Sequence, residues 1–480
     1  MNIFFNKLRL LVVFYLVAIS SLAHSQNMQA EMADFINGFH NFKQFNGNVL
    51  VAKDGKVLFE QSVGYANFEW GIKHSNKSKF RIGSITKQFT AMLILQLAQD
   101  GKLKLDDHLA TYLPNYRQDI ATKITIRQIL NHTSGLGNYT QAKSFRDEYS
   151  RNPYSVDEFI RLLCSDDLVF EPGTEFRYSN SGYFILGAVI EKVTGQKYQD
   201  VLQKNILDPL DMKDTGYDSH NKIIKFRVSG YDNGLAGYSN TDYLDMSIPY
   251  AAGSMYSTAR DLLKWDQALY TDKLLNNEYK KQMYQVSEQR NYALGWEVTN
   301  LDKSTYGKPL TRIQHGGGIN GFNAFISRII EDKLLVIILN NTGGAPLTPM
   351  TNGLLAIYYG KPYEKATEHA DSKLYNAFKR EGIAGLKNTY QQMVSEGNTP
   401  RERSLNYFGY ELMQMDELDA AITVFELNNQ SYPDSANTFD SLGEAYLTAG
   451  DKQKALASYK SALKLNPDSE SAKHAIEKLQ

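Results

Sequence analysis

The C-terminal part of the chain repeats itself every 34 residues, and this feature restricts its fold more than any other. The repeated positions are small, aromatic or proline residues in a fixed order: Gly409 and Gly443, Ala421 and Ala455, Phe425 and Tyr459, and Pro433 and Pro467. A period of this length is typical of units built from two helices. Because each unit buries its apolar face only against its neighbours, this part of the chain should form a stack of helix pairs.

The order of these positions resembles the tetratricopeptide repeat. Residues 374–395 fit a further, degenerate helix pair, and residues 472–479 fit a capping helix. We therefore expect an all-α tetratricopeptide-repeat domain over residues 372–480. The resemblance implies that a protein or peptide partner can bind the repeats. The polar stretch 361–371 is the expected linker to the preceding domain.

The part before the linker shows strand patterns that are far apart in the sequence. Four stretches read as strands: 48–53, 56–62, 322–330 and 334–340. The first two flank Asp54-Gly55, a dipeptide suited to a tight hairpin turn. Residues 334–339 are continuously apolar, which predicts a strand in the middle of a covered sheet. With a helix expected over residues 84–100, the sequence predicts one sheet built from distant parts of the chain.

The pattern of the N-terminal residues predicts an export signal. Lys7 and Arg9 precede a largely apolar run over residues 10–22, and Ala23-His24-Ser25 places small residues at the expected cleavage site. The apolar run is shorter than the ~20 residues that a membrane-spanning helix needs. We expect residues 1–25 to be removed on export. The chain from Gln26 would then act in the periplasm or outside the cell, without a membrane span.

Composition excludes several classes of function. A chain of 480 residues is too long for one ordinary core, so two or more domains are expected. Lys and Arg number 52 against 53 acids, so no basic field indicates nucleic-acid binding. Cys164 is the only cysteine, which excludes an intrachain disulfide and a cysteine-based metal site. The nine histidines show no His-x-x-x-His spacing, and we expect neither a metal nor a cofactor.

Ser84-Ile85-Thr86-Lys87 is the first candidate for chemistry. Residues three apart share one face of a helix, so the serine hydroxyl and the lysine amine can meet there. A neutral lysine can take the serine proton, and the positive end of a helix favours the anionic nucleophile. The same spacing occurs at Ser219 and, inside a repeat helix, at Ser461. A lone match is ordinarily a solvated helix start, so the motif alone does not establish a site.

Two further motifs lie downstream. In Tyr178-Ser179-Asn180 a tyrosinate could act as a base and the amide could hold a substrate carbonyl. The same Tyr-x-Asn form recurs at Tyr65, Tyr231 and Tyr238. The segment His315-Gly316-Gly317-Gly318 contains consecutive glycines, which allow a substrate to approach the backbone and leave N–H groups free for an oxyanion.

Taken together and in this order, the three motifs resemble the serine β-lactamase and penicillin-binding-protein superfamily. The resemblance is to the class C β-lactamase-like branch, which also contains D-aminopeptidases, DD-peptidases and esterases. Further segments carry it: 80–90, 124–136, 209–215, 252–258 and 294–296. It covers about residues 35–360. The Ser-Asp-Asn triplet of class A enzymes is absent from the sequence.

The resemblance implies a three-layer α/β fold over residues 26–360, with an antiparallel sheet between helices. It implies Ser84 as the nucleophile that forms an acyl-enzyme, with Lys87 and Tyr178 sharing the base role. Lys87 must then be neutral part of the time, so we expect burial and neighbouring charge to lower its pKa. His132 falls in a loop motif with no obvious partner, and we expect it to be structural.

The resemblance also implies the groups that bind substrate. They are Asn180, His315, Gly317 and Gly318, and the backbone N–H groups of Ser84 and Gly318 would form the oxyanion hole. β-Lactamases proper usually carry a lysine where His315 stands, and a histidine is often neutral at pH 7. We therefore expect weaker carboxylate recognition, and a preference for esters, amides or D-amino peptides over β-lactams. On this view His315→Lys should raise cephalosporin turnover.

Three functions follow, one of which the motifs favour. The first is an exported serine hydrolase that cleaves an ester, amide or peptide bond in a small-molecule or peptide acyl substrate. The second is a true class C-like β-lactamase. The third is a repeat-mediated binding protein with an inactive hydrolase domain. Retention of Ser84, Lys87, Tyr178 and Asn180 favours an active enzyme, and the segment 139–171 is expected to contribute to specificity.

Overall fold

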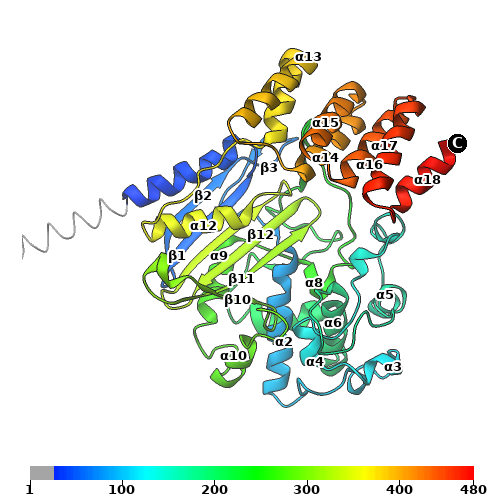
Figure 1. Ribbon diagram of the computed structural model, residues 1–480. Helices are drawn as coiled ribbons and strands as arrows, with labels where there is room; N and C mark the ends of the chain where they lie inside the picture. The colour runs from blue at the N-terminus through cyan, green and yellow to red at the C-terminus, as the bar shows by residue number, and fades with distance from the viewer. Residues whose placement is uncertain (1–25, 480) are drawn as a thin grey trace, which may run out of the picture. The chain divides into compact units, whose positions relative to one another are not determined.

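The computed structural model describes residues 26–479 (Figure 1). The predicted export signal, residues 1–25, lies outside the described residues. The chain divides into two compact units, one reaching residue 366 except for the short turn 234–237, and one from Thr367 onward. No helix in residues 26–479 is long and apolar enough to cross a membrane.

A six-stranded antiparallel sheet forms the centre of the first unit. Its strand order is β10-β11-β12-β13-β1-β2, so the two predicted hairpins lie next to one another. The strands are β10 (Glu297–Leu301), β11 (Leu310–Ile319), β12 (Phe322–Ile329), β13 (Leu334–Asn340), β1 (Gly47–Lys53) and β2 (Lys56–Val63). β1 pairs directly with β13, with Val51 opposite Val336. The prediction of one sheet from distant parts of the chain is confirmed.

The sheet is covered on both faces, which explains the unbroken apolar run in β13. Leu335, Ile337 and Leu339 join a core with the helices α2 (Thr86–Gln99), α6 (Asn180–Thr194) and α9 (Ala259–Ala268). Alternate residues such as Val336 and Ile338 face a second core with α12 (Leu347–Tyr358) and the helix of residues 26–41. Successive side chains of a strand point to opposite faces, so a strand covered on both faces is apolar throughout. The expected three-layer fold is confirmed.

The unit also contains many short elements. They are β3 (Tyr65–Asn67), β4 (Ile72–Lys73), β5 (Phe80–Arg81), η1 (Gly83–Ile85), α4 (Ile126–Leu130), α5 (Val156–Leu163), β6 (Gly216–Tyr217), β7 (Tyr231–Gly234), β8 (Gly237–Asn240), α8 (Tyr250–Gly253), β9 (Met255–Ser257) and α10 (Asn277–Met283). β5 and β6 both pair with β9, which places η1 beside the chain that follows α8.

The second unit consists of helices. They are α13 (Ala370–Ser395), α14 (Glu402–Gln414), α15 (Leu418–Ser431), α16 (Ala436–Thr448), α17 (Lys452–Leu465) and α18 (Glu470–Leu479). The repeated glycines have a packing reason, because a Cβ on Gly409 would lie 2.5 Å from the Phe425 ring and one on Gly443 would lie 3.0 Å from the Tyr459 ring. The helix pairs confirm the predicted all-α repeat fold. α13 contains a kink at Gly382, where φ is 64°.

Candidate active site

Ser84 lies in η1, a 3-10 helix of one turn that leads directly into α2. Gly83 has φ of 49°, and a Cβ there would lie 2.9 Å from the backbone nitrogen of Gly318. Glycine is therefore required both by the backbone conformation and by the close approach of β11. The turn holds the half-buried Ser84 hydroxyl against the edge of the sheet, as the motif predicted for a nucleophile at a helix start.

Lys87, the second residue of α2, is fully buried, and its Nζ has three partners. Nζ lies 2.8 Å from Asn180 Oδ1, 2.9 Å from the Ala252 carbonyl oxygen and 3.1 Å from Ser84 Oγ. Burial lowers the pKa of Lys87 well below its usual value. A neutral amine has two N–H groups and one lone pair. If the N–H groups donate to the two carbonyl oxygens, the lone pair is left to accept the Ser84 proton.

Asn180 is held in the orientation that this arrangement needs. Its Nδ2 donates to Asn138 Oδ1 at 3.2 Å, so its own Oδ1 faces Lys87. Sequence reasoning missed Asn138 and Ala252. Ala252 was noted only as part of the segment 252–258. Its contact with Lys87 uses the backbone carbonyl oxygen, which every residue has, so the residue type gives no signal of this role.

The Tyr178 hydroxyl is buried, although the side chain as a whole is partly exposed. It makes no hydrogen bond to any residue in 26–479. The ring centroid lies 4.8 Å from Lys87 Nζ. Burial raises the pKa of Tyr178 above its usual value, and the Ser84 hydroxyl opposes this only in part. Tyr178 is therefore a neutral phenol near pH 7 that can donate a proton, and its share in the base role stays a prediction.

His315 is buried behind the cleft wall, with only 4% of its surface exposed. Its Nδ1 lies 2.5 Å from the Gly316 carbonyl oxygen, which can only accept, so Nδ1 carries the proton. Its Nε2 then accepts from the Tyr292 hydroxyl at 2.8 Å. Burial lowers the pKa of His315 to about 4, and the hydrogen bond with the Gly316 carbonyl oxygen opposes this only in part. The ring is neutral at pH 7 and both nitrogens are occupied.

The His315 side chain points into the packed region around Tyr292, away from the cleft. A lysine at this position would enter the same buried space near Lys87, which does not favour a gain of cephalosporin turnover. The expected contact of His315 with substrate stays a prediction.

His132 also packs behind the site and has partners that the sequence did not suggest. Its Nδ1 accepts the Ser179 N–H at 3.1 Å. Its ring centroid lies 4.3 Å from that of Tyr178 and 4.8 Å from that of Tyr292. Burial lowers the pKa of His132 well below its usual value. The neutral ring supports one side of Tyr178.

Two of the three glycines of β11, Gly317 and Gly318, differ in exposure. A Cβ on Gly317 would lie 2.0 Å from the Ile82 carbonyl oxygen and 3.2 Å from the Ser84 nitrogen. Gly317 is buried against this segment, and its expected contact with substrate stays a prediction. Gly318 is exposed and lines the cleft together with Ser84. Their backbone N–H groups are the pair that the sequence predicted for an oxyanion hole.

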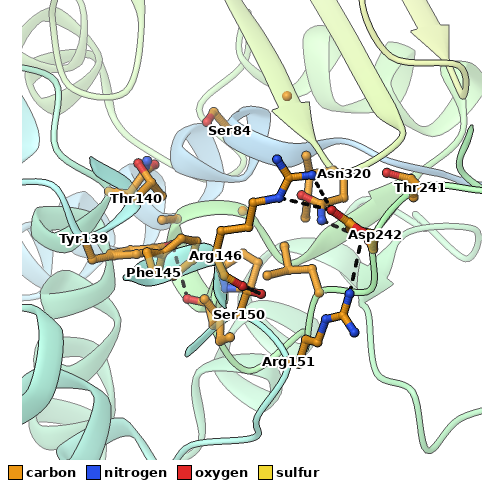
Figure 2. A pocket seen from close by; sticks show the side chains of 18 of the residues that line it. Ser84, Tyr139, Thr140, Phe145, Arg146, Ser150, Arg151, Thr241, Asp242 and Asn320 are labelled. Carbon is orange, nitrogen blue, oxygen red and sulfur yellow. Dashed lines mark hydrogen bonds and ion pairs between the residues drawn. The ribbon is translucent and has the colours of Figure 1, made fainter. Parts of the chain in front are cut away.

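Ser84, Asn180 and Gly318 open onto a cleft of about 700 Å³. The first part of the segment 139–171 lines it, including Tyr139 and Phe145, whose ring centroids are 5.3 Å apart. Figure 2 shows Arg146 and Arg151 pointing toward Asp242, with which both form ion pairs. The cleft therefore has an apolar wall and a charged wall. In residues 26–479, no cluster of three or more His, Cys, Asp or Glu side chains is arranged to hold a metal ion.

The sequence profile described as Beta-lactamase matches residues 39–358. The chain belongs to the beta-lactamase family. A tetratricopeptide-repeat profile matches residues 436–469, within the predicted repeat domain. The family resemblance drawn from the three motifs is confirmed.

Two named relatives and one solved structure illustrate what this chain is similar to. Penicillin-binding protein 4* of Bacillus subtilis (strain 168) is 28% identical over 72% of this chain and 80% of its own length. Protein flp of Staphylococcus aureus (strain MRSA252) is 27% identical over 72% of this chain, and the match spans 66% of its own length. The crystal structure of D-stereospecific amidohydrolase from Streptomyces sp. is 26% identical, with a TM-score of 0.57 over 71% of this chain and 99% of that chain.

Proposed function

We propose that this family member is an exported serine hydrolase that cleaves an ester, amide or peptide bond through an acyl-enzyme on Ser84. The three-way contact of Lys87 Nζ with Ser84, Asn180 and Ala252 carries the proposal. It supplies a base of lowered pKa at hydrogen-bond distance from the nucleophile, with its N–H groups already engaged. A binding protein with a decayed site would have no need of this arrangement.

The first half of the reaction follows from these positions. Lys87 Nζ takes the Ser84 hydroxyl proton as Oγ attacks the substrate carbonyl carbon. The N–H groups of Ser84 and Gly318 bind the resulting oxyanion. When the intermediate collapses, the bond to the leaving group breaks, and the neutral Tyr178 donates its proton to that group. The Lys87 ammonium then returns a proton to Tyr178, which leaves the amine neutral in the acyl-enzyme.

The second half regenerates the enzyme by the same route. A water molecule gives its proton to Lys87 and attacks the acyl carbon. The oxyanion occupies the same two N–H groups, and Ser84 leaves with the proton that Lys87 holds. The net reaction adds one water across the substrate bond and consumes no cofactor.

The position of His315 favours acyl substrates without an obligatory carboxylate. A neutral, buried ring at residue 315 presents no cation to the cleft that could attract a substrate carboxylate. The D-stereospecific amidohydrolase among the relatives makes D-amino acid amides a class to test. The tetratricopeptide repeats indicate a capacity for protein interaction, and we propose a protein or peptide partner for them.

Initial rates on p-nitrophenyl butyrate, a D-amino acid amide and a chromogenic cephalosporin test the proposal. We expect ester or amide turnover that Ser84→Ala abolishes, with little cephalosporin cleavage. Ser461→Ala is the matched control, because Ser461-x-x-Lys464 has the same spacing inside α17 and should leave turnover unchanged.

Two results would contradict the proposal. Turnover that persists in Ser84→Ala would assign the activity to another group. No turnover of any substrate by a correctly folded protein would favour the binding-protein alternative. Rapid cephalosporin cleavage that depends on Ser84 would instead make the protein a β-lactamase and refute the argument from His315.

A further inference from the structure

The most exposed large apolar side chains of the first unit gather on two segments. They are Ile223 at 98% exposed, Trp70 at 82%, Phe226 at 59% and Ile72 at 55%. Single apolar residues on a surface are ordinary, but a group of the largest exposures in one region marks an interaction site. None of the four lines the catalytic cleft, so catalysis does not explain them.

The two segments are neighbours, although about 150 residues separate them in the sequence. The Lys79 N–H donates to the Phe226 carbonyl oxygen at 2.9 Å, and the Val228 N–H donates to the Lys79 carbonyl oxygen at 3.1 Å. The Ser229 N–H donates to the Ala66 carbonyl oxygen at 2.9 Å, which brings the second segment to β3. The β3–β4 segment and the loop 219–228 are therefore adjacent in space.

Lysines accompany the apolar side chains on this surface. Lys73, Lys77, Lys222 and Lys225 are all exposed. None of them forms an ion pair with a carboxylate of residues 26–479, and Lys77 Nζ instead lies 5.8 Å from the Phe226 ring centroid. We call these four lysines, with Trp70, Ile72, Ile223 and Phe226, the apolar–basic face.

The positive charge of the apolar–basic face is local. The chain as a whole has a formal charge of −1, with 52 basic and 53 acidic residues. Across residues 65–79 and 219–228 the only acidic residue is Glu69, and it accepts a hydrogen bond from the Tyr231 hydroxyl. The other two cations of these segments are already paired, the buried Lys79 with Asp214 and the half-buried Arg227 with Asp218. The exposed lysines therefore carry charge that no neighbour neutralises.

We propose that the apolar–basic face binds the protein to the surface of an anionic phospholipid membrane. Exposed tryptophan, phenylalanine and isoleucine can enter the boundary between headgroups and acyl chains, and a tryptophan ring suits that depth. Unpaired lysines around them attract the lipid phosphates. A purely apolar protein interface would not need four lysines without ion-pair partners beside its apolar side chains. The proposal does not depend on the hydrolase function.

Sedimentation with lipid vesicles tests the proposal on the processed chain that begins at Gln26, so that the apolar run 10–22 cannot itself bind. The vesicles are phosphatidylcholine alone, or phosphatidylcholine with an equal amount of phosphatidylglycerol. We expect binding to the second kind only, and we expect it to weaken as added salt shortens the range of the charge attraction.

Two double variants separate the apolar and the charged contributions. Trp70→Ser with Ile223→Ser removes the most exposed apolar groups, and Lys73→Glu with Lys222→Glu reverses two charges. Each lysine near an anionic surface contributes enough that the reversal should lower the partition coefficient by about tenfold or more. The matched controls are Val169→Ser with Val286→Ser and Lys123→Glu with Lys192→Glu, all exposed and distant in sequence from the face. They should bind like the wild type.

Thermal unfolding of each variant shows that it is folded before its binding is compared. Failure to bind the anionic vesicles would overturn the proposal. Binding that the control pairs lower as much as the face variants would overturn it as well. If the processed chain self-associates in sedimentation velocity, and the face variants abolish this association, the face is an interface between two copies and the lipid proposal is wrong.

Discussion

Replacement of Lys87 by methionine should change how stability depends on pH, because the buried amine is the group with the most unusual protonation in the site. Its folded-state pKa is lowered by burial, whereas in the unfolded chain it should lie near 10.4. Between these two values the unfolded chain binds one proton more than the folded protein. The free energy of unfolding of the wild type should therefore rise with pH in this window. The contribution is complete above the unfolded pKa and is lost as pH falls through the folded pKa.

The magnitude follows from the proton count. One proton corresponds to a slope of about 1.4 kcal/mol per pH unit within the window. Lys87→Met should lack this slope. The substitution also leaves the Asn180 and Ala252 carbonyl oxygens without a donor, which should lower the free energy of unfolding by about 1–3 kcal/mol for each oxygen. It also removes the cost of burying the amine, which should raise the free energy of unfolding. Near pH 8 the two effects oppose each other, so the slope is a sharper signal than the absolute stability.

Urea unfolding at several pH values between 8 and about 10 measures the slope for both proteins. The difference between wild type and Lys87→Met cancels the buried tyrosines, which both proteins share. Lys192→Met removes an exposed lysine and should keep the wild-type slope. Ester turnover should fall by about 10²–10⁴-fold in Lys87→Met, the usual contribution of a positioned base. Equal slopes in wild type and Lys87→Met would refute the claim that the amine is buried in its neutral form.

Three further substitutions test other parts of the site. Gly317→Ala should unfold the protein or abolish turnover, because its Cβ would lie 2.0 Å from a backbone carbonyl oxygen. Gly318→Ala has open space for its Cβ and should keep the wild-type melting temperature. Similar melting temperatures of the two variants would contradict this packing. Tyr178→Phe should slow amide hydrolysis much more than p-nitrophenyl ester hydrolysis, because p-nitrophenolate leaves without a proton; equal losses of kcat would exclude Tyr178 as the donor to the leaving group. Tyr292→Phe leaves His315 Nε2 buried without a donor and should cost about 1–3 kcal/mol in urea unfolding, and no measurable loss would show that this hydrogen bond is unimportant.

Local pattern was sufficient for most of the architecture. The Asp54-Gly55 turn and the continuous run in β13 predicted adjacent, covered strands, because turn geometry and side-chain alternation act over a few residues. The repeat period predicted the helix pairs, since each glycine there meets an aromatic ring one helix away. Ser84 and Lys87 could be paired from sequence because a helical turn brings them to one face.

The sequence by itself thus determined the family, the layered sheet and the helical repeats, and it singled out Ser84 and Lys87 as the pair that we propose for nucleophile and base. Only the tertiary structure decided their protonation and their partners. Lys87 meets Asn180 and Ala252 across 93 and 165 residues of chain, and the motif around His315 could not reveal that its ring turns inward to Tyr292. The pKa of a side chain depends on burial and on neighbours brought together by folding, and neither is written in local spacing.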